Sequence, residues 1–378
     1  MRFKIIHCFL ILCLIFAYAN SNSAQAPFKK WGFETLNQID KDLKLEHGLG
    51  YYEDSSRDDV SFAWGNAILL LAKAQAFEID DSYKPEFENQ VKILDEYFVV
   101  SGGIGGYNCL PVHKNTEVDR YYDDNAWIAM ALIDAYEASG DKKFLKKAKR
   151  TIDYSLSGVD EDGGGLFWRE NWPENAKKSK NTCSVAPTSF SCLKFYQITK
   201  QDKYFNEAKE LMQWLDKTLK DEEGLYFDHI TEDARIGRRK WSYNSAMPVR
   251  CYIQLYKITG EKSYLQKAKK TADASIEKWY EDDGGLNCKA MFGFTLVEAW
   301  FELSEITGNP KWKNIAFEVM RNVRENVMGP RGRYSDDWDD KNSSPVRRWQ
   351  LLYPAAAARG YLAAAEYQFA QKKTEKKD

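Results

Sequence analysis

The sequence predicts an all-α fold, an (α/α)6 barrel in which a toroid of six inner helices is wrapped by six outer helices. Three observations support it: a short turn recurs along the chain, a glycine-rich loop recurs between the turns, and helices buried on all sides alternate with amphipathic ones. The turn is centred at positions 80, 140, 200, 260 and 308, which gives spacings of 60, 60, 60 and 48 residues. Self-similarity at a long, regular period indicates a fold built from one repeated unit.

The segments before and after each turn differ in kind. Residues 126–133 are apolar on every side, which predicts a helix that is buried all round. Residues 144–156 place apolar side chains at helical spacing on one face and lysines on the other. A buried helix followed by an amphipathic one, repeated along the chain, indicates an inner ring covered by an outer ring.

A glycine-rich loop with an aromatic or acidic tail follows each outer helix. The six copies begin at Gly48, Gly102, Gly163, Gly224, Gly284 and Gly332. Residues 28–47 supply an extra outer helix at the start, and residues 349–369 supply an unpartnered inner helix at the end. Because these two helices complement each other, we expect a closed ring rather than an open solenoid with polar caps. The predicted catalytic domain is 27–371, followed by a disordered charged tail at 372–378.

The first 26 residues read as a signal peptide. A basic start precedes an apolar run to about position 19, and Ala24-Gln25-Ala26 forms a small-residue cleavage site. The run is too short for a membrane span, and Cys13 lies inside it, so a lipoprotein anchor is not expected. The sequence therefore predicts a secreted or periplasmic protein.

Composition excludes several classes of function. The formal charge of −2 becomes −4 once Arg2 and Lys4 are removed with the leader, so nothing draws the protein to nucleic acid. Five widely spaced cysteines and three histidines remain, which fits neither a disulfide framework nor a zinc site. We expect no cofactor, no bound metal and a monomer. Acidic turns at 160–162 and 281–283 suggest calcium, but they lack EF-hand spacing, and solvated turns are favoured there.

Asp123 and Asp124 lie side by side where an acidic, aromatic loop enters the second inner helix. Neighbouring carboxyls can lie ~5 Å apart, which fits a retaining glycosidase and is too close for an inverting one. The helix N-terminus favours the charged form of one carboxylate, and mutual repulsion raises the pKa of the other. The alternative is a helix cap, and Asp-Asp pairs also recur elsewhere in the chain.

The motif Tyr-Asp-Asp-Asn-Ala-Trp at 122–127, followed by residues 131–136 and Gly140-Asp141, resembles glycoside hydrolase family 76. Residues 163–168, 180–181 and 241–244 are similar to further motifs of that family, and the resemblance runs through nearly all of the chain after the leader. It implies an (α/α)6 barrel that hydrolyses α-1,6-linked mannan with retention and endo action. By this resemblance Asp123 is the nucleophile and Asp124 the general acid/base.

The chain departs from the family's pattern at positions that would line sugar subsites. The departures are Ile128, Thr182-Cys183 and Ser245. They put the substrate in doubt more than the chemistry. Aromatic and amide residues near the pair could contact sugar, or could instead pack the barrel and cap helices. The predicted substrate-binding residues are Tyr122, Asn125, Trp127, Gly165, Trp168, Asn181, Thr182, Asp228, Trp241, Tyr243 and Asn244.

Three other functions stay open at this point. The same barrel could act on a different α-linked glycan, or from the end of an α-mannan chain rather than within it. An epimerase of the same fold is less favoured, because so few histidines are present. A non-catalytic glycan-binding protein has no need of two adjacent carboxylates.

Overall fold

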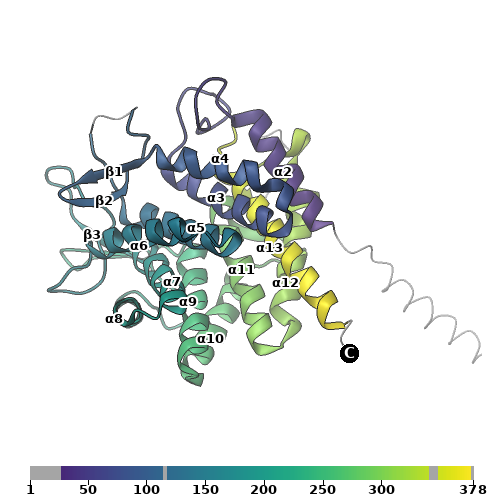
Figure 1. Cartoon of the computed structure of the whole chain (residues 1–378). Coiled ribbons are helices and arrows are strands. Elements are labelled where there is room, and N and C mark those ends of the chain that lie inside the picture. Colours follow the sequence, from purple (N-terminus) through teal and green to yellow (C-terminus); the bar gives the residue numbers. More distant parts are fainter. Residues whose placement is uncertain (1–26, 114–116, 340–347, 376–378) are drawn as a thin grey trace, which may run out of the picture.

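The computed structural model describes residues 27–113, 117–339 and 348–375. In these ranges twelve α-helices form two concentric rings, as the repeats predict (Figure 1). The inner helices are α3 (Ala63–Ile79), α5 (Tyr122–Ser139), α7 (Thr182–Thr199), α9 (Ser242–Thr259), α11 (Ala290–Thr307) and α13 (Leu352–Glu375). The outer helices are α2 (Phe28–Leu43), α4 (Lys84–Asp95), α6 (Lys142–Leu156), α8 (Asp202–Thr218), α10 (Lys262–Trp279) and α12 (Pro310–Asn322).

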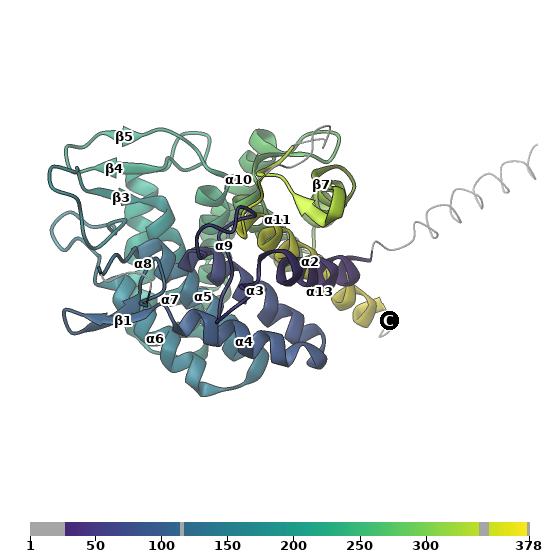
Figure 2. The same cartoon turned by 90° about the horizontal axis from the view of Figure 1, so that it is seen from above.

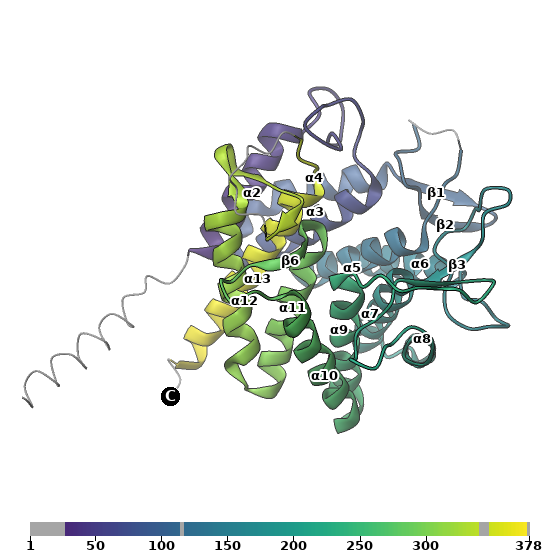
Figure 3. The same ribbon diagram turned by 180° about the vertical axis from the view of Figure 1, so that it is seen from behind.

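The two ends of the chain close the ring. Each inner helix packs against the next, and α13 contacts both α3 and α11, so the inner ring is complete (Figure 3). The outer helix α2 covers α13, which joins the first helix to the last. The chain therefore forms the closed (α/α)6 barrel that its complementary terminal helices predict.

In four of its five copies the recurrent turn is a left-handed cap at the end of an inner helix, whereas Asp80 after α3 is extended. Gly140, Gly260 and Gly308 end α5, α9 and α11 with φ of 70°, 73° and 68°. Lys200 adopts the same conformation after α7, with φ of 57°. Glycine is favoured there because it has no Cβ to clash at positive φ. The repeated turn thus returns the chain from each inner helix to the following outer helix.

Short antiparallel strands occupy the opposite end of the barrel, before the inner helices (Figure 2). β1 (Phe98–Ser101) pairs with β2 (Ile104–Tyr107) in a hairpin, and β4 (His229–Thr231) pairs with both β3 (Ser179–Asn181) and β5 (Ile236–Gly237). The remaining pairs are β6 (Leu286–Lys289) with β9 (Asp337–Trp338), and β7 (Met328–Gly329) with β8 (Arg333–Tyr334). Three shorter helical segments complete the described chain: η1 (Asp81–Tyr83), η2 (Val323–Val327) and η3 (Pro330–Gly332).

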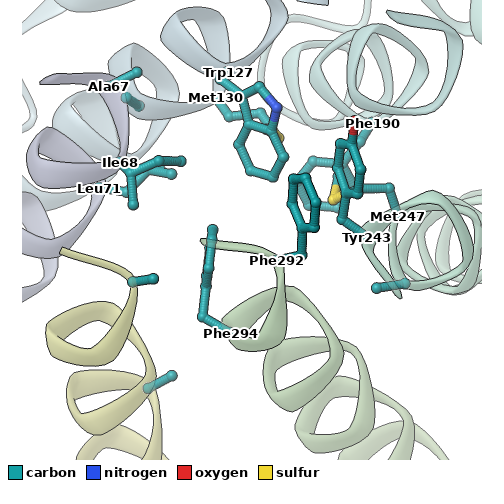
Figure 4. Packing of buried hydrophobic residues seen from close by; sticks show 14 of the residues in the cluster. Ala67, Ile68, Leu71, Trp127, Met130, Phe190, Tyr243, Met247, Phe292 and Phe294 are labelled. Atoms are coloured by element: carbon teal, nitrogen blue, oxygen red, sulfur yellow. The ribbon is translucent and has the colours of Figure 1, made fainter. Parts of the chain in front are cut away.

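Apolar side chains of the inner helices fill the middle of the barrel. Trp127 and Met130 from α5 face Phe292 and Phe294 from α11 across the core (Figure 4). Trp127 is 2% exposed, and Phe294 is fully buried. The barrel is therefore a packed core rather than a pore, and a ligand can enter only from its ends.

A buried ion-pair network lies at the end of the barrel where the inner helices finish. The Glu298 carboxylate accepts hydrogen bonds from Arg250 Nη1 at 2.6 Å and from Arg359 Nε at 2.5 Å. Arg250 also pairs with Glu302, and Arg359 with Asp134. Burial alone would raise the pKa of Glu298, but the two guanidinium groups hold it below its usual value. This network links α5, α9, α11 and α13 at the end opposite the loops.

The two ends of the chain and the cysteines were also the subject of predictions. The predicted leader at 1–26 lies outside the described residues. Helix α13 continues to Glu375, so residues 372–375 of the expected disordered tail are helical, in keeping with the good helix formers Lys and Glu there. All five cysteines of the described part are free and buried. Across the described ranges, no helix is both long and apolar enough to span a bilayer.

Candidate active site

A cleft of about 610 Å³ lies where the inner helices begin. Its wall is formed by the first turns of all six inner helices and by the loops that precede them. Helix N-termini point their unpaired backbone N–H groups toward this end. The glycine-rich loops therefore bring residues that are far apart in the sequence to one side of the barrel.

Asp123 lies in the first turn of α5 and receives three hydrogen bonds. Trp168 Nε1 donates to Oδ2 at 2.9 Å, Cys183 Sγ donates to the same oxygen at 3.4 Å, and the backbone N–H of Asp124 donates to Oδ1 at 3.0 Å. Burial raises the pKa of Asp123 to about 6, and these donors limit the rise because they stabilise the ionised form.

Asp124 lies next in the chain but in a different environment. Among the described residues no donor reaches its carboxyl group, which is partly exposed to the cleft. Burial, the negative charge of Asp123 and that of Asp119 raise the pKa of Asp124 well above its usual value. The two neighbouring carboxyl groups thus differ in pKa because their surroundings differ: Asp123 is the easier to ionise and Asp124 the easier to protonate.

A buried arginine holds the loops around the pair. Arg120 forms a two-point contact with Glu170, from Nε at 2.8 Å and from Nη2 at 2.6 Å, and donates from Nη1 to the Ile104 carbonyl at 2.8 Å. The backbone N–H of Tyr122 donates to the Trp168 carbonyl at 3.0 Å. The β1–β2 hairpin, the 163–170 loop and the start of α5 are therefore tied together, which fixes Trp168 beside Asp123.

Two groups of aromatic side chains line the cleft. Tyr121 and Trp168 pack edge to face, with ring centroids 5.1 Å apart. In the second group, Tyr243 stacks on Phe292 with centroids 4.0 Å apart and rings nearly parallel, as Figure 4 shows. Trp241 also packs on Phe292, at 5.4 Å. Flat apolar faces beside carboxylates suit sugars, which present C–H faces and hydroxyl edges.

Polar side chains at the starts of α7 and α9 complete the cleft. Asp228 Oδ2 interacts with His229 Nδ1 at 3.1 Å, and Asp228 Oδ1 accepts from Asn244 Nδ2 at 3.3 Å. Asn181 Oδ1 accepts from the Ser179 hydroxyl at 2.7 Å. No hydrogen bond of its amide nitrogen is found within the described ranges.

The structure brings most of the predicted site residues together. Those that line the cleft are Asp123, Asp124, Trp127, Trp168, Asn181, Asp228, Trp241 and Tyr243. They come from the motifs at 121–127, 163–168, 180–181 and 241–244, and from the loop that ends at Asp228.

Five residues predicted to bind substrate lie behind the cleft wall instead. Tyr122 is 7% exposed and stacks on Tyr154, and Asn125 is fully buried with its amide bonded to the Tyr107 backbone. The other three are similarly occupied: Gly165 packs under Trp214, the Thr182 hydroxyl donates to the Phe227 carbonyl, and Asn244 supports Asp228. Their contacts give them supporting positions.

Other cleft residues were not predicted from the sequence. The exception is Cys183, a departure from the family's pattern that was expected to line a subsite; the departures Ile128 and Ser245 are instead fully buried. The unpredicted residues are Glu53, Phe62, Trp64, Cys109, Asp119, Tyr121, Ser179, His229, Phe292 and Leu352. Most lie in the first turn of an inner helix or just before it, so the predicted starts of the inner helices are the signal that could have identified them. Glu53 is a further carboxyl group of the cleft, and burial raises its pKa to about 7.

The cleft carboxylates are not arranged as a metal site. Within the described ranges, no three His, Cys, Asp or Glu side chains converge closely enough to hold an ion. Asp119 is instead ion-paired with Arg169, and the Cys109 thiol donates to it at 3.7 Å.

A closed (α/α)6 barrel with an adjacent carboxylate pair and aromatic walls at its loop end defines a glycoside hydrolase of the helical-barrel class. Comparison with known families agrees. The chain belongs to glycosyl hydrolase family 76, whose family model matches residues 50–293.

Solved structures of similar fold include several members of this family. A GH76 α-mannanase of Bacteroides thetaiotaomicron is 32% identical, with a TM-score of 0.89 over 92% of this chain and 98% of that one. An α-1,6-mannanase of Salegentibacter sp. HEL1_6 is 21% identical, with a TM-score of 0.76 over 90% of this chain and 99% of that one. It was solved with α-1,6-mannotriose as an inactive variant in which two consecutive aspartates are replaced by asparagine.

Two further matches are less similar to this chain. A cellobiose 2-epimerase of Bacillus thermoamylovorans is 14% identical with a TM-score of 0.72 over 89% of this chain and 99% of that one, so it shares the fold alone. The meiotically up-regulated gene 191 protein of Schizosaccharomyces pombe is 20% identical over 201 residues, or 50% of this chain. The match spans only 45% of that curated relative.

Proposed function

We propose that this protein is a retaining, endo-acting α-1,6-mannanase, with Asp123 as the nucleophile and Asp124 as the general acid/base. The observation that carries the proposal is the contrast between the two carboxyl groups. Asp123 receives three hydrogen bonds, whereas within the described residues Asp124 receives none and faces the negative charges of Asp123 and Asp119. A retaining glycosidase needs one ionised and one protonated carboxyl group in this way.

The proposed reaction has two steps. Asp123 attacks the anomeric carbon of one mannose while Asp124 gives its proton to the departing glycosidic oxygen, so a covalent glycosyl ester forms. Asp124, now ionised, takes a proton from water, which attacks the same carbon and releases Asp123. Two inversions leave the anomeric configuration unchanged.

The composition of the cleft favours a neutral glycan over an acidic one. Five carboxyl groups line it: Glu53, Asp119, Asp123, Asp124 and Asp228. Arg169 is committed to Asp119, and His229 to Asp228. A uronide would add negative charge to this low-dielectric space, where like charges repel strongly. This weighs against the uronide hydrolases that share helical barrels.

Support for α-1,6-mannan and for endo action comes from family membership and the aromatic groups. The matched α-1,6-mannanase of Salegentibacter sp. HEL1_6 was inactivated at two consecutive aspartates, and Asp123 and Asp124 are likewise consecutive here. Two separate aromatic groups in one cleft offer stacking surfaces for more than one sugar. With the predicted leader at 1–26, we place this activity outside the cytoplasm.

The direct test is incubation with debranched α-1,6-mannan, followed by chromatography of the products. A ladder of oligosaccharides that appears early supports endo action, and the anomer formed first, read by proton NMR, reports retention. Asp123→Asn and Asp124→Asn should each lower kcat by at least ~10³-fold. Wild-type activity in either variant would overturn the assignment. If the protein hydrolyses another α-linked glycan but not α-mannan, the proposed substrate is wrong.

A further inference from the structure

The Cys183 thiol occupies an unusual place for a cysteine. It belongs to the first turn of α7, it is 4% exposed, and its sulfur lies 3.4 Å from Asp123 Oδ2. Tyr243, on the neighbouring helix α9, lies near enough to the same sulfur to affect the pKa of the thiol. The thiol is therefore a link between the carboxylate of α5 and the aromatic wall of the cleft.

The thiol is a proton donor here. Burial and the charges of Asp123 and Asp228 raise the pKa of Cys183 well above its usual value, so the sulfur keeps its proton at neutral pH. Asp123, with a pKa of about 6, is then mainly ionised and accepts. A thiol is a weak donor in water, but a hydrogen bond to a buried charge is stronger than one between neutral groups.

The two oxygens of Asp123 are unequally occupied. A carboxylate oxygen offers about two lone-pair positions. Among the other described residues, Oδ2 receives both the Trp168 indole and the Cys183 thiol, whereas Oδ1 receives the backbone N–H of Asp124. Oδ1 is consequently the oxygen that receives fewer donors from neighbouring residues.

We infer that Cys183 is a positioning residue for the glycosidase reaction: with Trp168 it holds Asp123 Oδ2 as the spectator oxygen, so that Oδ1 attacks the sugar. The inference rests on the proposed function, since it takes Asp123 as the nucleophile. In the glycosyl ester, Oδ2 becomes the carbonyl oxygen and keeps both donors. When the ester is hydrolysed, the same donors stabilise the carboxylate that leaves.

The kinetic test compares Cys183→Ala with Cys183→Ser. Alanine removes the donor, so kcat on α-1,6-mannan should fall about tenfold, with KM changed less than about twofold because the contact is with Asp123. The acid limb of kcat/KM should move up by roughly 0.5–1 pH unit, since the ionised form loses a donor. Serine keeps a donor and should retain the wild-type limb and most of kcat.

Cys192→Ala is the matched control. Cys192 lies on the same helix and is fully buried, but it is not part of the cleft. Its replacement should change Tm without moving the pH limb. If Cys183→Ala keeps the wild-type limb, or if the serine and alanine variants lose kcat equally, the sulfur acts only by filling space and the inference fails.

A second measurement does not depend on activity. In protein labelled with ¹³C at the aspartate carboxyl carbon, the Asp123 signal is assigned by its loss in Asp123→Asn and is titrated in wild type and Cys183→Ala. The inference expects a higher Asp123 pKa in the alanine variant, and an unchanged pKa overturns it. Failure of the wild type on every α-glycan would instead overturn the proposed function, so the two failures are distinguishable.

Discussion

Trp168 donates a hydrogen bond from its indole Nε1 to Asp123 Oδ2 over 2.9 Å. The contact joins the 163–170 loop to the first turn of α5, across 45 residues of sequence. An indole can donate but cannot accept, so this partner favours the ionised form of Asp123. One aromatic side chain therefore both lines the sugar cleft and tunes the proposed nucleophile.

Trp168→Phe should separate these two roles, because phenylalanine keeps a stacking face and loses the donor. We expect kcat to fall about 10- to 100-fold, as for loss of a hydrogen bond to a charged group in a buried site. The acid limb of kcat/KM should shift to higher pH, while KM changes little. Steady-state kinetics across pH 4–9 would check this. A raised KM with an unchanged limb would mean that Trp168 acts only as a sugar platform.

The architecture follows from the sequence because its signal is repeated. The turn recurs five times, and four of its copies place a residue at positive φ, such as Gly140 or Gly260, so the copies reinforce one another. Closure was also predictable, since an outer helix at one end and an inner helix at the other leave complementary unpaired faces. A sequence repeat does not fix the residue at which each helix ends. Helix α13, for example, continues to Glu375.

The candidate site was predictable where residues lie in motifs and not where they meet only in space. Asp123, Trp168 and Trp241 stand in local patterns, and all three line the cleft. Glu53 and Phe292 are brought there by ring closure, which no local window contains. In the other direction, a motif does not say which way its side chains point.

Asp124→Asn should stabilise the folded protein at alkaline pH. Burial, Asp123 and Asp119 raise the pKa of Asp124, so the folded state binds its proton more tightly than the unfolded state does. Stability therefore falls as pH rises from the unfolded pKa through the folded one. The variant removes this penalty, and we expect a gain of at least about 1 kcal/mol at pH 8 and a smaller one at pH 4. Urea unfolding at both pH values would check it. A gain that does not grow with pH would contradict the assigned protonation.

Gly158→Ala should disturb the site by a steric route. A Cβ at position 158 would lie 2.6 Å from the ring of Tyr122, which is buried against Tyr154 and precedes Asp123. We expect a loss of about 1–3 kcal/mol from overpacking, together with a lower kcat. Gly140→Ala is the control, because its added methyl meets open space. It should cost about 1 kcal/mol through its positive φ alone and leave kcat unchanged. If Gly158→Ala and Gly140→Ala lower kcat equally, the contact with Tyr122 does not explain the loss of activity.

Glu298→Gln should destabilise the barrel at the end opposite the cleft. The change leaves Arg250 and Arg359 buried with fewer countercharges, so we expect a loss of about 3 kcal/mol. The pKa of Glu298 is lowered in the fold, so its contribution is present above the unfolded pKa and lost as pH falls through the folded one. The variant and wild type should therefore converge in strong acid. Glu137→Gln, at the half-exposed pair with Lys194, should cost under about 1 kcal/mol. Equal losses in both variants would mean that burial does not set the effect.

Carboxyl groups of the cleft should make the enzyme favour a neutral oligosaccharide over a negatively charged one. A linear α-1,6-mannan oligosaccharide with one internal phosphate should show a KM at least about tenfold above that of the neutral chain, because the added negative charge enters a cleft lined by Glu53, Asp119 and Asp228. The gap should narrow as ionic strength rises and screens the repulsion. The same chain with an acetyl ester in place of the phosphate controls for bulk. Kinetics at 20 mM and 500 mM salt would provide the comparison. If the phosphate and the acetyl ester raise KM equally at both salt levels, size rather than charge governs entry to the cleft.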